Sequence, residues 1–118
     1  MAKIITAAEA AALVKDNDVV AFAPDSLAGF PNEVAFAIRD RFLKEGHPAD
    51  ITTIRAAGMG TFSDDEFGEG CFCVDGLLKC SISSYIAICK RLARHVEENR
   101  VQAYMFPMGP LHQLFRAV

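Results

Sequence analysis

The chain of 118 residues has the length of one domain, and its 52% apolar and 23% charged residues are typical of a folded protein. Its net charge of -3, with both signs mixed, excludes the dense basic surface of a nucleic-acid-binding protein. No apolar run approaches the roughly 20 residues of a membrane-spanning helix, and the N-terminus lacks the apolar core of a secretory signal. We therefore expect a cytoplasmic domain that binds neither nucleic acid nor membrane.

The first third of the chain predicts a helix and then a strand. Thr6 and Glu9 have the spacing of a capping box, which predicts a helix over residues 7–14. The continuous apolar run of residues 19–23 predicts a parallel strand that is covered on both faces. The loop that follows it, residues 24–31, is our first site candidate, because ligands bind at the carboxyl ends of parallel strands.

The same alternation continues in the middle of the chain. Pro31 and Gly46 enclose an apolar pattern that repeats every four residues, which predicts a helix between them. Residues 51–54 predict a second strand, which leads into a glycine-containing loop at 55–60. Residues 61–70 are acidic, have no periodicity and lack the ligand spacing of a calcium-binding loop. We expect this segment to be an exposed loop.

The last third repeats the pattern once more. Residues 77–82 predict a weaker strand, residues 85–99 an amphipathic helix and residues 101–106 another strand. The apolar pattern of residues 111–118 predicts a final helix, which stops without a cap. We therefore expect the chain to be part of a longer protein. Alternating strands and helices predict one α/β domain over residues 1–118, with an open, mostly parallel sheet and helices on both faces.

The cysteine and histidine side chains give no pattern of a metal site or a nucleophilic triad. The cysteines are spaced by two, seven and nine residues, which does not match the paired spacing of a zinc site, so we predict reduced and buried thiols at Cys71, Cys73, Cys80 and Cys89. His47 lies in a turn and His95 on a charged helix face, and we expect both on the surface.

Three loops after predicted strands carry a resemblance to a known family. They are residues 26–33 (SLAGFPNE), 55–60 (RAAGMG) and 106–109 (FPMG). Together with residues 75–79 (DGLLK) and 113–116 (QLFR), their order and spacing resemble the N-terminal part of the family I CoA-transferases, in particular the fused-chain acetate or propionate enzymes. The resemblance covers nearly the whole chain.

The resemblance implies half of an enzyme that packs against a similar second half, with the active site between them. In such enzymes a glutamate of the second half attacks an acyl-CoA, and the resulting glutamyl-CoA thioester passes CoA to a short-chain acid. Coenzyme A is thus a substrate, and no permanently bound cofactor or metal is implied. No glutamate of this chain matches the nucleophile, so we predict no catalytic residue here and no turnover by the isolated chain. The implied partners are acyl-CoA, a small carboxylate, the second half and further copies of the protein.

The substrate- and CoA-binding residues that the resemblance implies are Gly29, Gly58, Gly60, Met108 and Gly109. From the residues alone, sharp strand-to-helix turns are the plainer explanation of the glycines, and Met108 suits a pocket wall and a core position equally. The resemblance therefore favours a site that the residue types leave open.

Two departures from the family pattern bear on the substrate. Pro24 and Asp25 stand where the family has glycine and an aromatic residue, and Met108 stands where the family has a glutamine that contacts substrate. Proline removes a backbone donor, and methionine cannot donate to a carbonyl but can line an apolar pocket. An alternative function is a non-catalytic α/β module that binds a small acid or a nucleotide.

Overall fold

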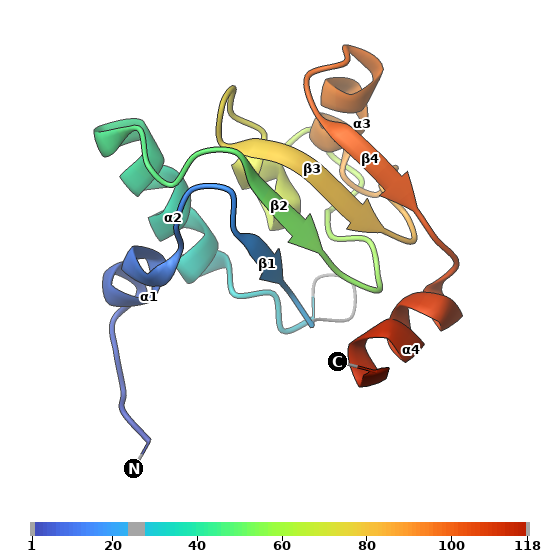
Figure 1. The fold of residues 1–118 in the computed structure, drawn as a ribbon. Helices are drawn as coiled ribbons and strands as arrows, with labels where there is room; N and C mark the ends of the chain where they lie inside the picture. The colour runs from blue at the N-terminus through green and yellow to red at the C-terminus, as the bar shows by residue number, and fades with distance from the viewer. Residues whose placement is uncertain (1, 24–27, 118) are drawn as a thin grey trace.

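Four parallel strands form one sheet in the order β1-β2-β3-β4 (Figure 1). The computed structural model describes residues 2–23 and 28–117. The strands are β1 (Val19–Ala21), β2 (Ile51–Ile54), β3 (Leu78–Ser83) and β4 (Gln102–Met105). The helices are α1 (Ala7–Leu13), α2 (Asn32–Glu45), α3 (Lys90–Glu97) and α4 (Met108–Ala117), with a 3-10 helix η1 at Gly68–Phe72. The predicted α/β class with an open parallel sheet is confirmed.

Local sequence signals explain the ends of the first two helices. The Thr6 hydroxyl accepts a hydrogen bond from the backbone N–H of Glu9 at 3.2 Å, while the Glu9 carboxylate accepts from the backbone N–H of Thr6 at 2.8 Å. This is the predicted capping box. Helix α2 ends at Gly46, whose φ of 74° is a left-handed conformation that glycine adopts without strain.

The two faces of the sheet differ in their cover. One face presents Val20, Thr53, Ser81 and Ala103, which lie in register across the four strands. Thr53 and Ser81 are fully buried, and Thr53 bonds to η1, so η1 lies on this face together with α2 and α3 that contact it. The hydrophobic core is built here, around fully buried side chains such as Phe72, Ile38 and Leu92.

The opposite face is more open to solvent in the described residues. It presents Val19, Thr52, Cys80 and Gln102 in one row and Ala21, Ile54, Ile82 and Tyr104 in the next. Val19 is 64% exposed and Tyr104 is 53% exposed, so this face has an apolar rim in contact with water. The prediction that the strand at residues 19–23 is covered on both faces is wrong, because β1 is an edge strand with little packed against its outer side.

No helix in the described ranges is both long and apolar enough to pass through a membrane.

Candidate functional site

The loops that the sequence selects lie at one edge of the sheet. All four strands are parallel, so their carboxyl ends, at Ala21, Ile54, Ser83 and Met105, meet at the same edge (Figure 1). Segments with free backbone N–H groups commonly gather at such an edge. Residues 24–27, including Pro24 and Asp25, lie outside the described residues.

The loop after β2 is packed against the segment after β3. A Cβ atom at Gly58 would collide with the carbonyl oxygen of Tyr85 and lie 2.7 Å from Cγ2 of Ile88. A Cβ atom at Gly60 would collide with the carbonyl oxygen of Ile88 and lie 2.7 Å from Cα of Cys89. Both positions therefore require glycine because of close backbone approach. Any contact that they make with a ligand uses the backbone.

This packing explains why one predicted helix is shorter than expected. The periodicity predicts a helix over residues 85–99, but α3 begins only at Lys90. Residues 85–89 are not helical and include a turn at residues 87 and 88, and the N–H of Phe62 donates to the carbonyl of Ile88 at 2.8 Å. The carbonyl of Ile88 thus accepts a hydrogen bond from outside the predicted helix, whereas in a longer helix it would accept one from within.

A buried ion pair supports the start of the glycine loop. Arg55, which directly follows β2, is 1% exposed and pairs with Glu69 of η1, which is also 1% exposed. Arg55 Nη1 donates to the hydroxyl of Ser81 at 3.1 Å, and the hydroxyl of Thr53 donates to Glu69. The network joins β2, β3 and η1 beneath the loop. Removal of either charge would leave the other uncompensated in the core.

The expectation of an exposed acidic loop is wrong for residues 68–70, which are buried, and incomplete for residues 61–67. Glu69 and its two neighbouring glycines are buried in η1, because Arg55 supplies a partner in the core. Asp64 pairs with Arg91 and Arg94 of α3, and hydrogen bonds from these guanidinium groups, with Arg94 first, lower the pKa of the carboxyl. The exposed acidic side chains thus tether the segment to a neighbouring helix.

The residues after β4 are exposed. Met108 is 46% exposed at the first position of α4, and Gly109 follows it with open space around its Cα. Phe106 is 48% exposed beside them. Gly29, in the loop after β1, lies in an exposed turn with a φ of 76°. The structure thus brings Gly58 and Gly60 together in one loop and leaves the other three candidates on separate exposed segments.

Two hydroxyl groups at the end of β3, those of Ser83 and Ser84, are not among the site residues that the sequence predicts. Ser83 is fully buried, and within the described residues neither its Oγ nor that of Ser84 has a hydrogen-bond partner. A hydroxyl can both donate and accept, but both oxygens are buried, so neither is open to a ligand as the chain stands. A serine pair directly after a predicted strand is the signal that could have identified them.

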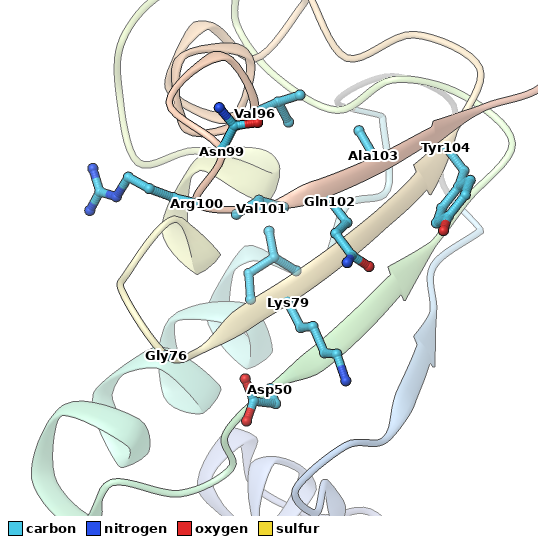
Figure 2. A pocket seen from close by; sticks show the side chains of 11 residues that line it. Asp50, Gly76, Lys79, Val96, Asn99, Arg100, Val101, Gln102, Ala103 and Tyr104 are labelled. Atoms are coloured by element: carbon cyan, nitrogen blue, oxygen red, sulfur yellow. The ribbon is translucent and has the colours of Figure 1, made fainter.

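Two surface hollows lie away from this edge. One, of about 660 Å³, reaches from Asp50 across Lys79 and Gln102 to Tyr104. Figure 2 shows the long side chains of Lys79 and Gln102 projecting from β3 and β4 into it. The other, of about 880 Å³, lies between α1 and α2. Among residues 2–23 and 28–117, no three His, Cys, Asp or Glu side chains are grouped to hold a metal ion.

His95 is another position where the expectation is wrong. It is 8% exposed, on the inner side of α3, although its neighbours in sequence are charged. Burial, and next the positive charge of Arg100, lower the pKa of its imidazole. The helix turns this side chain towards the segment that carries Cys73, with which it lines a small hollow.

The amino-acid sequence of the chain is similar to those of known proteins. No protein-family model matches it. Over 118 residues, all of this chain, it is 33% identical to the caffeate CoA-transferase of Acetobacterium woodii. The chain is a homologue of the CoA-transferases. It is also 26% identical, over 99% of its length, to one subunit of a probable succinyl-CoA:3-ketoacid coenzyme A transferase of Bacillus subtilis (strain 168).

Solved structures agree with this relationship at the level of the fold. The acyl-CoA transferase YdiF of Escherichia coli O157:H7, in a thioester complex with CoA, matches 96% of the chain with a TM-score of 0.79 and 24% identity. Its apoenzyme matches 97% with a TM-score of 0.80. The predicted resemblance to the N-terminal part of the family I CoA-transferases is confirmed. The chain spans only 22% and 46% of the two sequence relatives.

Proposed function

We propose that this CoA-transferase homologue forms the N-terminal, substrate-facing part of an enzyme that moves CoA between a short-chain acyl-CoA and a carboxylic acid such as acetate or propionate. The observation that carries the proposal is the 33% identity to a CoA-transferase over the whole chain. In this proposal a glutamate outside the chain attacks the acyl-CoA and carries CoA as a thioester. Such covalent catalysis divides one difficult exchange into easier acyl transfers.

The role of the chain is to bind and orient the acyl group and CoA. Backbone N–H groups around Gly58 and Gly60 are the proposed donors to developing oxyanions, because the Arg55 ion pair and close packing against residues 85–89 fix the place of their loop. Gly29 and Gly109 are proposed to let a ligand approach the backbone closely on either side. These roles follow from the position of the loops at one sheet edge and from the resemblance.

Met108 is proposed to select the acyl chain. Its side chain is 46% exposed, so it is available to line an apolar pocket when the second half of the enzyme closes over it. A thioether gives no hydrogen bond to a polar acceptor. We therefore propose a preference for apolar short-chain acids over acids with a polar group near the carboxylate.

The test is exchange of labelled acetate into acetyl-CoA. A protein in which the chain is continuous with a second α/β half that bears a loop glutamate should catalyse exchange, and the isolated chain should not. In the active protein, reduction with borohydride should convert one glutamate of the second half to an alcohol, because a thioester is reduced and a carboxylate is not. Exchange by the isolated chain would overturn the proposal.

The specificity of Met108 has its own experiment. Met108→Gln in the complete protein should raise KM for propionate relative to acetate while kcat for acetate changes little. Gln113→Met, which alters a polar residue on the same helix, is a control for nonspecific effects on α4. An equal change in KM for all acids would contradict the proposal that Met108 lines the acyl pocket.

A further inference from the structure

Positive side chains dominate the wall of the small hollow beside α3. The hollow has a volume of about 280 Å³, and its charged lining residues are Arg91, Arg94, Arg100, Asp64 and Glu98. Three guanidinium groups against two carboxylates leave one positive charge in excess. Arg100 lies just before β4, so this part of the hollow is at the amino ends of the strands and not at the edge that carries the candidate site.

The imidazole of His95 lines the same hollow without a protein partner. The residue is only 8% exposed, and burial and nearby charges shift the pKa of its ring without any hydrogen bond to a described residue. Buried polar groups nearly always have a hydrogen-bond partner, so the unpaired ring is a position that a ligand can complete. After burial, the charge of Arg100 is the strongest influence that lowers the pKa, which shows a positive field at the ring.

The two arginines of α3 have hydrogen-bonding capacity to spare. Within the described residues Arg94 donates to Asp64 through Nη2 alone, which leaves Nε and Nη1 free. The bonds of Arg91 to Asp64 and Glu66 measure 3.4 and 3.5 Å, whereas charge-assisted bonds are typically about 2.7–2.9 Å. Arg100 differs, because all three of its nitrogens donate to Asp75 or Glu98, so it contributes charge only.

The carboxylates that hold these arginines are easily displaced. The side chains of Asp64 and Glu66 are 46% and 55% exposed, so either can turn to water when an anion takes its place. Ion pairs between exposed side chains contribute little to stability. A ligand with more negative charge than one carboxylate therefore competes well for Arg91 and Arg94.

Size and geometry select the class of anion. The hollow is smaller than the sites of about 300–1,000 Å³ that hold drug-sized molecules. Arg91, Arg94 and His95 lie on neighbouring positions of one helix face, three and four residues apart, and so offer donors from more than one direction. One guanidinium fork satisfies a planar carboxylate, whereas a tetrahedral phosphate has further oxygens for a second arginine and an imidazole.

We propose that this hollow binds a phosphate group, either as inorganic phosphate or as the phosphate of a small monoester. Arg94 and Arg91 donate to its oxygens, His95 donates through one ring N–H, and the charge of Arg100 favours the dianion. Asp64 turns to solvent as the anion enters. The site is separate from the glycine loops, and its existence does not depend on the proposed transferase function.

The experiment titrates the full chain with inorganic phosphate at pH 7.5 and follows the histidine rings by nuclear magnetic resonance. Sodium chloride keeps the ionic strength constant, which separates specific binding from screening. The chain has three histidines, so His47 and His112 are internal controls, and His95→Gln assigns the third signal. The signal of His95 alone should shift and saturate, and the pKa of His95 should rise, because a bound dianion stabilises the imidazolium.

A second titration with methyl phosphate distinguishes the two sources of the phosphate group. Tighter binding of methyl phosphate would identify a monoester as the ligand, and tighter binding of inorganic phosphate would identify the free anion. The absence of saturation by either compound at millimolar concentrations would overturn the proposal. Equal shifts at all three histidines would also overturn it, because they would show a general effect of salt.

Two matched variants complete the test. Arg94→Met should raise the dissociation constant for phosphate by about tenfold or more, because charge-assisted hydrogen bonds are lost. Arg116→Met, which removes an exposed arginine of α4, should leave it unchanged. Far-ultraviolet circular dichroism checks that both variants are folded. Equal affinity of Arg94→Met and wild type would overturn the assigned site. None of these outcomes depends on transferase activity, so failure here leaves the proposed function standing.

Discussion

The loop after β2 and the residues after β4 are predicted to serve the same site, but they are built differently. Residues 55–60 are all buried, held by an ion pair below and by residues 85–89 above. Phe106, Met108 and Gly109 are exposed, and a Cβ atom at Gly109 would meet nothing within 4 Å beyond its chain neighbours and the backbone of its own helix. The glycines of the first loop are therefore required by packing, whereas Gly109 is not.

The comparison shows two different reasons why a glycine can occur in a candidate site. A glycine that other backbone atoms approach closely is required for folding, and its loss says nothing about ligand binding. A glycine in open space can be replaced without damage to the fold, so a functional change there reports on a ligand. Substitutions in the two regions should differ accordingly.

The largest effect is expected at the ion pair. Arg55→Met should lower the free energy of unfolding by about 3–5 kcal/mol, because it leaves the Glu69 carboxylate buried without a partner. Urea denaturation measures it. The double variant Arg55→Met/Glu69→Met should regain part of the loss. Arg100→Met, which removes an exposed arginine that also forms an ion pair, should change little. Equal effects at Arg55 and Arg100 would contradict the assigned support of the loop.

Gly58→Ala is expected to have the next largest effect. The added methyl collides with the carbonyl oxygen of Tyr85, and displacement of residues 85–89 should cost about 3 kcal/mol in the free energy of unfolding. Chemical denaturation again provides the measurement. A variant as stable as wild type would show that the loop and residues 85–89 are not packed as described.

A smaller effect on the free energy of unfolding is expected from a fall in pH, because His95 is buried in α3, the helix that follows residues 85–89. The pKa of His95 is lowered by burial and then by Arg100, with Arg94 acting in the same direction and Asp75 and Glu98 opposing it. As pH falls below the ordinary value of 6.5, the unfolded chain takes up a proton that the folded chain does not, so stability falls. Denaturation at pH 8 and pH 5.5 should show a smaller loss for His95→Gln than for wild type. An identical loss in both would contradict burial of a neutral imidazole.

Gly109→Ala should have the smallest effect, and of opposite sign. Gly109 lies in α4, and a methyl group added there would meet nothing within 4 Å, so alanine should stabilise the chain by less than about 1 kcal/mol. The same substitution thus acts oppositely at Gly58 and Gly109. If Gly109→Ala destabilised the chain as much as Gly58→Ala, the claim that packing requires glycine only in the loop after β2 would be contradicted.

The sequence by itself predicted the features that neighbouring residues decide. The capping box of Thr6 and Glu9 and the left-handed Gly46 need only their own helices, and both are present. Alternation of strand and helix patterns predicted the parallel sheet, because short crossovers in one direction leave few other arrangements. Loop motifs indicated the relationship to CoA-transferases, which whole-chain similarity confirms.

The tertiary structure decided which of these elements are buried and where helices begin. Glu69 is buried because an arginine 14 positions earlier in the chain meets it in the core, and acidic composition could not reveal that partner. Helix α3 begins at Lys90 because two glycines of a distant loop pack against residues 85–89. Contacts between residues far apart in the chain also set the contrast between the buried loop after β2 and the exposed residues after β4. Local patterns carry no information on such contacts.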